Sequence, residues 1–159
     1  MATMTYQEYC ESNQKSFNEL PLFFAFSDEQ LYAEMEKRGL KRTELSKIVR
    51  ISSSGAFALK SDLPAIKAWL NREETPLETL MQDPDFAEDA FYYEMCNHEY
   101  GINWQGAWDV CSCFGDPKYS EEKTGIGYLR DLGYGEETMK AYLRAEKRYY
   151  HDANENDWM

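Results

Sequence analysis

Residues 73–100 constrain the fold and the surface of this chain more than any other stretch. They contain nine carboxylates and no Lys or Arg. The same stretch contains Phe86, Phe91, Tyr92 and Tyr93, whose large rings are costly to leave in water. These residues therefore predict a folded element that buries aromatic side chains and presents acid on another face.

The rest of the chain is not uniformly acidic. Residues 41–72 carry seven Lys and Arg against two acids, whereas residues 1–40 and 101–159 each have a formal charge of −4, and the whole chain has −12. Affinity for a phosphate backbone rests on Lys and Arg that release counterions, so direct binding of nucleic acid is not expected. The expected partners are basic proteins, and a second copy that offers its basic segment is an alternative.

The length and composition predict a folded protein. A chain of 159 residues can bury a sizeable core, and its 43% hydrophobic and 15% aromatic residues argue against disorder. No apolar run is long enough to cross a bilayer, and the first residues lack the pattern of a signal peptide. We expect a cytoplasmic protein whose four cysteines are reduced.

The periodicity and the capping signals predict a mostly helical α+β fold with a small antiparallel sheet. We expect a single domain over residues 1–150 and a flexible C-terminal tail over residues 151–159. The sheet would combine a strand at 22–26 with a hairpin at 48–60. Helix starts such as Thr5 with Glu8 fit the capping box. The predicted helices are 5–18, 27–38, 62–70, 75–81, 83–100, 103–114, 120–132 and 136–150.

The predicted helix 83–100 has an apolar face and an acidic face at 100° per residue. The apolar face comprises Phe86, Ala87, Ala90, Phe91 and Tyr93. The opposite face comprises Asp85, Glu88, Asp89, Tyr92, Cys96 and Glu99. No basic neighbour one turn away relieves the repulsion, which costs a few tenths of a kcal/mol per pair. We expect a partner-binding surface with Tyr92 as its aromatic contact and Asp85, Glu88, Asp89 and Glu99 as its charges; a merely solvated face is the alternative.

Metal binding has weak support from the spacing of possible ligands. Cys96, His98 and Glu99 are close in sequence, and Cys111 and Cys113 follow. Zinc ligands are usually spaced so that both face one ion, whereas residues two apart on a helix project about 200° apart. We therefore expect no metal and no cofactor, and we interpret the cysteines as small buried thiols.

Catalysis has no stronger signal. The chain has two histidines, His98 and His151, and lacks the sequence motifs of a nucleophilic serine or a phosphate-binding loop. His98 lies one turn after Glu94, and an ordinary Glu–His pair is the simplest interpretation. The chain is not expected to be an enzyme; a small metal-binding enzyme centred on His98 is the weaker alternative.

The basic block allows a second interpretation. Residues 43–57 could form a helix-turn-helix with a Ser-rich start to its recognition helix. Arg50 stands at the turn position where Gly is favoured, however, and Gly55 falls inside the recognition helix, so the hairpin is the better prediction. The corresponding alternative function is a DNA-associated regulator that uses Lys41, Arg42, Lys47 and Arg50.

Two segments resemble an uncharacterised family of small proteins from bacteriophages and mobile elements of gut bacteria. The first is Phe17–Gln30, with its Phe-Phe-Ala-Phe-Ser run, continued by Met35–Leu40; the second is the Asn97-His98-Glu99-Tyr100 block. The resemblance covers residues 17–115 and implies no mechanism. It implies a genomic setting in which counter-defence proteins occur, and it marks Asn97–Tyr100 as a motif for packing or binding.

The combined expectation is a non-catalytic acidic inhibitor. It would occupy a basic nucleic-acid-binding surface of a host protein, such as a CRISPR effector or a restriction enzyme, in the manner of a nucleic-acid mimic.

Overall fold

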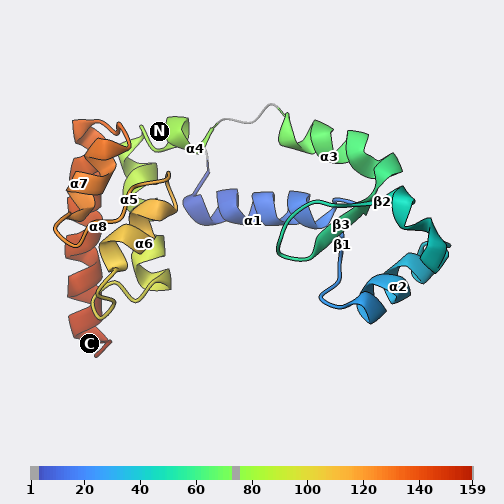
Figure 1. Cartoon of the computed structure of the whole chain (residues 1–159). Helices are drawn as coiled ribbons and strands as arrows, with labels where there is room; N and C mark the ends of the chain where they lie inside the picture. Colours follow the sequence, from blue (N-terminus) through green and yellow to red (C-terminus); the bar gives the residue numbers. More distant parts are fainter. Residues whose placement is uncertain (1–3, 73–75, 159) are drawn as a thin grey trace. The chain divides into compact units, whose positions relative to one another are not determined.

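The structure, a computed structural model, describes residues 4–72 and 76–158 (Figure 1). It confirms the predicted fold class, which is mostly helical with a small antiparallel sheet. The chain divides into two compact units, and the single domain expected over residues 1–150 stays a prediction. Unit 1 is Met1–Asn13 with Thr75–Met159, and unit 2 is Gln14–Glu74. The division falls inside helix α1 (Tyr6–Asn18), and each unit has its own hydrophobic core.

The charge of the chain separates with the two units. Unit 1 has 20 carboxylates and 7 Lys and Arg, which gives a formal charge of −13, whereas unit 2 has 9 and 10, which gives +1. Unit 1 therefore carries the whole negative surplus, well beyond the acidic stretch that the sequence emphasised.

The sheet belongs to unit 2. Strand β3 (Ala56–Leu59) lies between β1 (Phe23–Phe24) and β2 (Ile48–Arg50), and both pairings are antiparallel. Phe23 and Phe57 face each other across β1 and β3, with ring centroids 6.0 Å apart. This stacked pair lies in the core of unit 2, where it packs with Met35 of α2 (Asp28–Lys37).

The basic block forms a hairpin, so the helix-turn-helix interpretation is wrong. A short 3₁₀ helix η1 (Arg42–Lys47) leads into β2, and the turn to β3 contains Gly55 with φ +85°. The β-branched residues Ile48, Val49 and Ile51 favour the extended backbone over a helix at this point. η2 (Lys60–Asp62) and α3 (Leu63–Leu70) follow, so the predicted helix 62–70 is confirmed within a residue.

Capping signals placed several helix starts correctly. The side chains and backbone N–H groups of Thr5 and Glu8 bond reciprocally before α1, at 2.8 and 3.1 Å. Ser27 accepts a hydrogen bond from the Gln30 N–H at the start of α2. The predicted cap at Thr75 lies outside the described residues.

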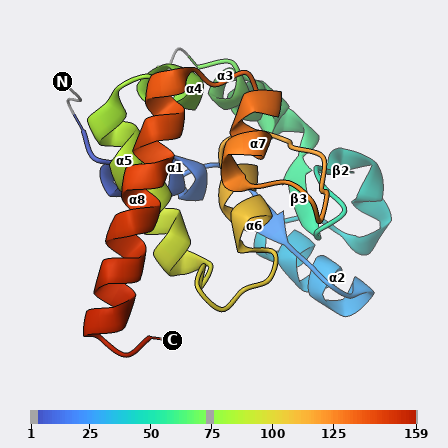
Figure 2. The same ribbon diagram turned by 90° about the vertical axis from the view of Figure 1, so that its left-hand side faces the viewer.

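Unit 1 is helical in its described part. Its elements after the start of α1 are α4 (Leu77–Leu80), α5 (Pro84–Asn97), α6 (Gly106–Ser112), α7 (Gly125–Asp131) and α8 (Glu136–Glu155). The long helices α5 and α8 lie side by side (Figure 2).

No described helix of the chain is both long and apolar enough to cross a bilayer.

Three helix predictions need correction. α7 begins at Gly125, after its cap Thr124, rather than at the predicted Ser120. α5 ends at Asn97 rather than Tyr100, and its buried face contains Glu94 and Met95, whereas Tyr93 is exposed. α8 continues past the predicted end at Tyr150 to Glu155, because Ala153, one turn after the buried Tyr149, is also buried. Residues 151–155 thus belong to a helix and not to the predicted tail.

Replacement of Gly55 by Ala should destabilise unit 2 by about 1–3 kcal/mol. A Cβ atom there would lie 2.8 Å from the Ala25 carbonyl oxygen and 2.9 Å from the Phe26 ring, at a φ of +85°. Gly39→Ala is the matched control, since its φ is +73° but no atom lies within 4 Å of the added Cβ. Urea unfolding should give a clearly larger loss for Gly55→Ala than for the control; equal losses would contradict the close packing at Gly55.

Candidate functional site

The predicted acidic surface of α5 is partly engaged by the neighbouring helix α8. The Glu88 carboxylate accepts a hydrogen bond from Arg144 Nε at 2.8 Å. Tyr92 donates its hydroxyl to Asp152 at 2.5 Å, and the Arg148 guanidinium lies 3.7 Å from the centre of its ring. These contacts occupy Glu88 and Tyr92 within the unit.

The other three predicted partner-binding residues, Asp89, Asp85 and Glu99, differ in whether their carboxylates have a partner within the chain. Asp89 accepts a hydrogen bond from the Tyr6 backbone N–H at 3.3 Å. Asp85 and Glu99 are exposed, and no hydrogen bond or ion pair joins their carboxylates to another described side chain. Only these two acids of the predicted surface have unengaged carboxylates in the described part of the chain.

The Asn97–Tyr100 motif divides between two environments. Tyr100 packs edge-on to Tyr149 at 5.8 Å and donates its hydroxyl to Glu146 at 2.6 Å, so its role is to fasten the end of α5 to α8. Asn97 and His98 instead point to Glu94: Asn97 Nδ2 donates to Glu94 Oε2 at 3.3 Å. Glu99 faces solvent.

A cluster of polar side chains surrounds the buried carboxylate of Glu94, which is 5% exposed. The Tyr6 hydroxyl donates to its Oε1 at 2.9 Å. Its Oε2 lies 3.2 Å from His98 Nε2 and 3.3 Å from Cys113 Sγ, which are themselves 3.5 Å apart. The predicted Glu94–His98 pair is therefore confirmed, and a thiol from the end of α6 joins it.

The cysteines of the Cys-x-Cys pair diverge, as their spacing predicts. Cys111 is fully buried and its thiol donates to the Gly125 carbonyl at 3.6 Å, whereas Cys113 faces Glu94. Burial raises the pKa of Cys111 to about 12, and burial followed by the charge of Glu94 raises that of Cys113 to about 12. Both are therefore neutral thiols at physiological pH. Cys96 is exposed and lies outside the Glu94 cluster.

The Glu94 cluster is not arranged as a catalytic triad. In a triad the nucleophile contacts one ring nitrogen of the histidine, and the orienting carboxylate contacts the other. Here Cys113 and Glu94 both approach the same nitrogen, Nε2 of His98. His151 is at the end of α8, exposed and beside Asp152, so it adds no base to this cluster.

A hollow of about 320 Å³ lies where α5 and α8 end in unit 1. We call it the α5–α8 hollow; it is lined by Cys96, Glu99, Ile102, Tyr149 and Trp158. Ile102 is 63% exposed, and Trp104 in the same loop is 79% exposed. Large apolar side chains in water beside an unengaged acid are typical of protein-binding surfaces.

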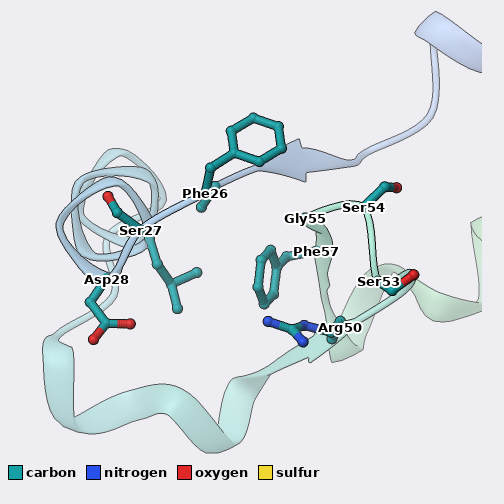
Figure 3. A pocket seen from close by; sticks show the side chains of 10 residues that line it. Phe26, Ser27, Asp28, Arg50, Ser53, Ser54, Gly55 and Phe57 are labelled. Carbon is teal, nitrogen blue, oxygen red and sulfur yellow. The ribbon is translucent and has the colours of Figure 1, made fainter.

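Unit 2 has a separate pocket of about 640 Å³ next to the hairpin (Figure 3). Figure 3 shows the Arg50 guanidinium beside the Phe57 ring, while Asp28 lies across the pocket and Phe26 at its rim. Arg50 and Asp28 balance each other in charge. The pocket therefore lacks the positive surplus that a phosphate backbone requires.

Three of the four basic residues proposed for DNA contact have partners within unit 2. Lys47 is paired with Glu44, and the Arg42 guanidinium lies 4.7 Å from the centre of the Tyr32 ring. Arg50 lies 5.5 Å from the Phe57 ring centre in the pocket, and Lys41 is the N-cap residue before η1. The recognition helix is absent from residues 43–57, so a helix-turn-helix does not support the regulator alternative, which otherwise stays a prediction.

Sequence reasoning missed the central residue of the Glu94 cluster. The sequence predicts a pair of Glu94 with His98, but Glu94 is missing from the predicted apolar face of α5. The spacing indicates that Glu94 lies on the buried face, because it follows the buried Ala90 and Phe91 by one helical turn. Cys113 was set aside together with Cys111, although only one of the two had to reach the histidine.

The fold and sites described so far define a small acidic α+β protein with a helical unit that carries the candidate sites. The chain belongs to a protein family of unknown function, DUF7659, whose family model matches residues 5–109. No curated protein and no solved structure matches the chain significantly. The expected membership of a family without an assigned activity is confirmed, and the family supplies no activity to transfer.

The protein should lose stability at alkaline pH. Because the folded state raises the pKa of Cys111 to about 12, it favours the neutral thiol. The contribution of this thiol to the free energy of unfolding is therefore fully present below the pKa of the unfolded thiol, which is near 9. It is lost as the pH rises from 9 towards 12, by up to about 1.4 kcal/mol per pH unit. Urea unfolding at pH 7.0, 9.0 and 10.5 measures the slope.

Cys111→Ala is the control for this slope. The variant should be less stable than wild type at pH 7.0, because it leaves a cavity, but its stability should decline less between pH 9.0 and 10.5. A decline as steep as that of the wild type would show that the thiol is not responsible.

Proposed function

We propose that the protein is a non-catalytic acidic protein that binds a basic protein partner through unit 1. The observation that carries this proposal is the formal charge of −13 on unit 1 together with exposed aromatic and apolar side chains around the α5–α8 hollow. Charge draws a basic partner towards the surface, and the apolar side chains supply contact area once it arrives.

Glu99 gives the strongest local support for binding at the hollow. Its φ is +50°, in the left-handed region, and the Tyr100 N–H bonds to the Met95 carbonyl at 3.0 Å, which closes α5 as a Schellman motif. Glycine is the usual residue at this position, and other residues cost roughly 1 kcal/mol there. Glu99 is exposed, its carboxylate is unengaged, and its backbone conformation is unfavourable for a residue other than glycine. A contact between its carboxylate and a partner would explain why glutamate occupies this position.

The exposed apolar side chains supply the second part of the surface. Ile102 and Trp158 line the hollow, and Trp104 is 79% exposed in the loop that continues from Ile102. Tryptophan and tyrosine are frequent among the residues that dominate binding energy at protein interfaces. A basic partner with an apolar side chain that enters the hollow would match both the charge and the shape.

The predicted surface on α5 contributes unequally to this proposal. Asp85 and Glu99 can pair with a partner directly. Glu88 and Tyr92 would first have to leave Arg144, Arg148 and Asp152, which lowers what they can contribute. We therefore place the contact surface at the C-terminal end of α5.

A more specific proposal concerns the partner. The acidic surface would occupy the basic nucleic-acid groove of a host protein in the bacterial cytoplasm, such as a CRISPR effector or a restriction enzyme, as a counter-defence inhibitor. Its support is the charge of unit 1 and the resemblance to bacteriophage and mobile-element proteins. It remains a prediction that depends on the identity of the partner.

Glu99→Gly should remove partner binding without loss of stability, because glycine suits the left-handed position better than glutamate. Tagged full-length protein is used to recover partners from bacterial lysate, which are identified by mass spectrometry and then purified for binding measurements. Glu122→Gly, at an exposed acid outside the hollow, is the matched control. The purified partner should bind wild type and control alike and bind Glu99→Gly at least tenfold more weakly.

Two results would contradict this proposal. One is equal affinity of the purified partner for Glu99→Gly and wild type. The other is a partner with an acidic surface, or an affinity that does not weaken as salt rises, because screening must reduce attraction between opposite charges.

A further inference from the structure

We propose that Glu94, His98 and Cys113 together form a binding site for a transition-metal ion, and that the ion is Zn²⁺. The ligands come from α5, from its C-terminal cap and from the cap of α6, so the site would join these two helices of unit 1. This inference is independent of the proposed partner.

The distances among the three ligand atoms fit one ion. Oε2 of Glu94, Nε2 of His98 and Sγ of Cys113 are separated by 3.2, 3.3 and 3.5 Å. Tetrahedral zinc with ordinary bond lengths to oxygen, nitrogen and sulfur separates its ligands by about 3.3–3.7 Å. Shifts of a few tenths of an ångström would therefore convert the hydrogen-bonded cluster into a coordination shell.

The burial of Glu94 supplies the electrostatic reason for a cation. A carboxylate that is 5% exposed is costly unless it is paired. In the part of the chain that the structure describes, the only ion pair of Glu94 is with His98, a residue that is neutral unless protonated. A divalent ion would supply the positive charge that no Lys or Arg provides there.

Neighbouring residues already hold the ligands in the required orientation. The Tyr6 hydroxyl binds Oε1 of Glu94 at 2.9 Å, whereas Oε2 faces His98 and Cys113 and also accepts a hydrogen bond from Asn97 Nδ2 at 3.3 Å. Asn103 Nδ2 donates to the His98 carbonyl at 3.1 Å and to Asp109 at 2.7 Å, which fixes the turn that carries the histidine. Such supporting hydrogen bonds around the ligands are typical of built metal sites.

The donor types select the metal. A thiolate, an imidazole and a carboxylate suit Zn²⁺, whereas Mg²⁺ and Ca²⁺ prefer oxygen ligands alone. On binding, the Sγ–H bond of Cys113 breaks, a sulfur–metal bond forms and the proton passes to solvent. The side chain of His98 is 32% exposed, which gives solvent access to the cluster, and we assign the fourth tetrahedral position to water.

The test uses full-length protein freed of metal by a chelator and then titrated with Zn²⁺ or Co²⁺. Co²⁺ reports on the ligands, because a thiolate bound to it gives a charge-transfer absorption band in the near ultraviolet. Wild type should bind one ion per chain and show this band. Cys113→Ser should lose the band, and Cys96→Ser, which removes an exposed thiol of α5, should keep it.

His98→Gln is a second variant in case Cys113→Ser fails to fold, since His98 is only partly buried at a helix end. It should bind Zn²⁺ at least tenfold more weakly than wild type, and Zn²⁺ should raise the melting temperature of wild type but not of this variant. The proposal is overturned if wild type binds no stoichiometric Zn²⁺ or Co²⁺. It is also overturned if the band survives Cys113→Ser or disappears in Cys96→Ser.

Discussion

The packing of α5 against α8 is the constraint on which unit 1 depends. Four fully buried alanines lie on these helices and permit close approach: Ala87, Ala90, Ala141 and Ala145. Phe91 fills the space beside them, edge-on to Tyr142 at 5.1 Å and to Phe114 at 5.0 Å. Because this core has no room for water around a charge, a carboxylate that enters it must be satisfied by specific partners, and Glu94 is such a carboxylate.

Local sequence signals predicted the helix starts and the hairpin, since these depend on neighbours within a few residues. Thr5 and Glu8 form their capping box, and the positions of Arg50 and Gly55 correctly favoured the hairpin over a recognition helix. The faces of α5 were predicted less well. The spacing after Ala90 and Phe91 is compatible with a buried Glu94, but the hydrogen bond that satisfies its carboxylate comes from Tyr6, 88 residues earlier in the chain, and no periodicity within α5 contains that contact.

The same limit applies to the candidate sites. The acids of α5 looked unneutralised because no basic residue lies nearby in sequence, yet Arg144 reaches Glu88 from a helix that begins at Glu136. For the metal ligands, the spacing argument correctly separated Cys111 from Cys113. It could not show that one of them meets a histidine from another helix, because that meeting depends on how α5 and α6 pack.

The family match ends at residue 109, inside α6, and this boundary separates the proposed zinc ligands from one another. Glu94 and His98 lie within the shared portion, whereas Cys113 and the whole of α8 lie beyond it. The matched portion alone lacks α8, so the part of α5 that packs on α8 would need a different helix or a different polypeptide to cover it. The matched segment thus contains two of the proposed zinc ligands, and the segment outside the match contributes the third together with the helix that packs on α5.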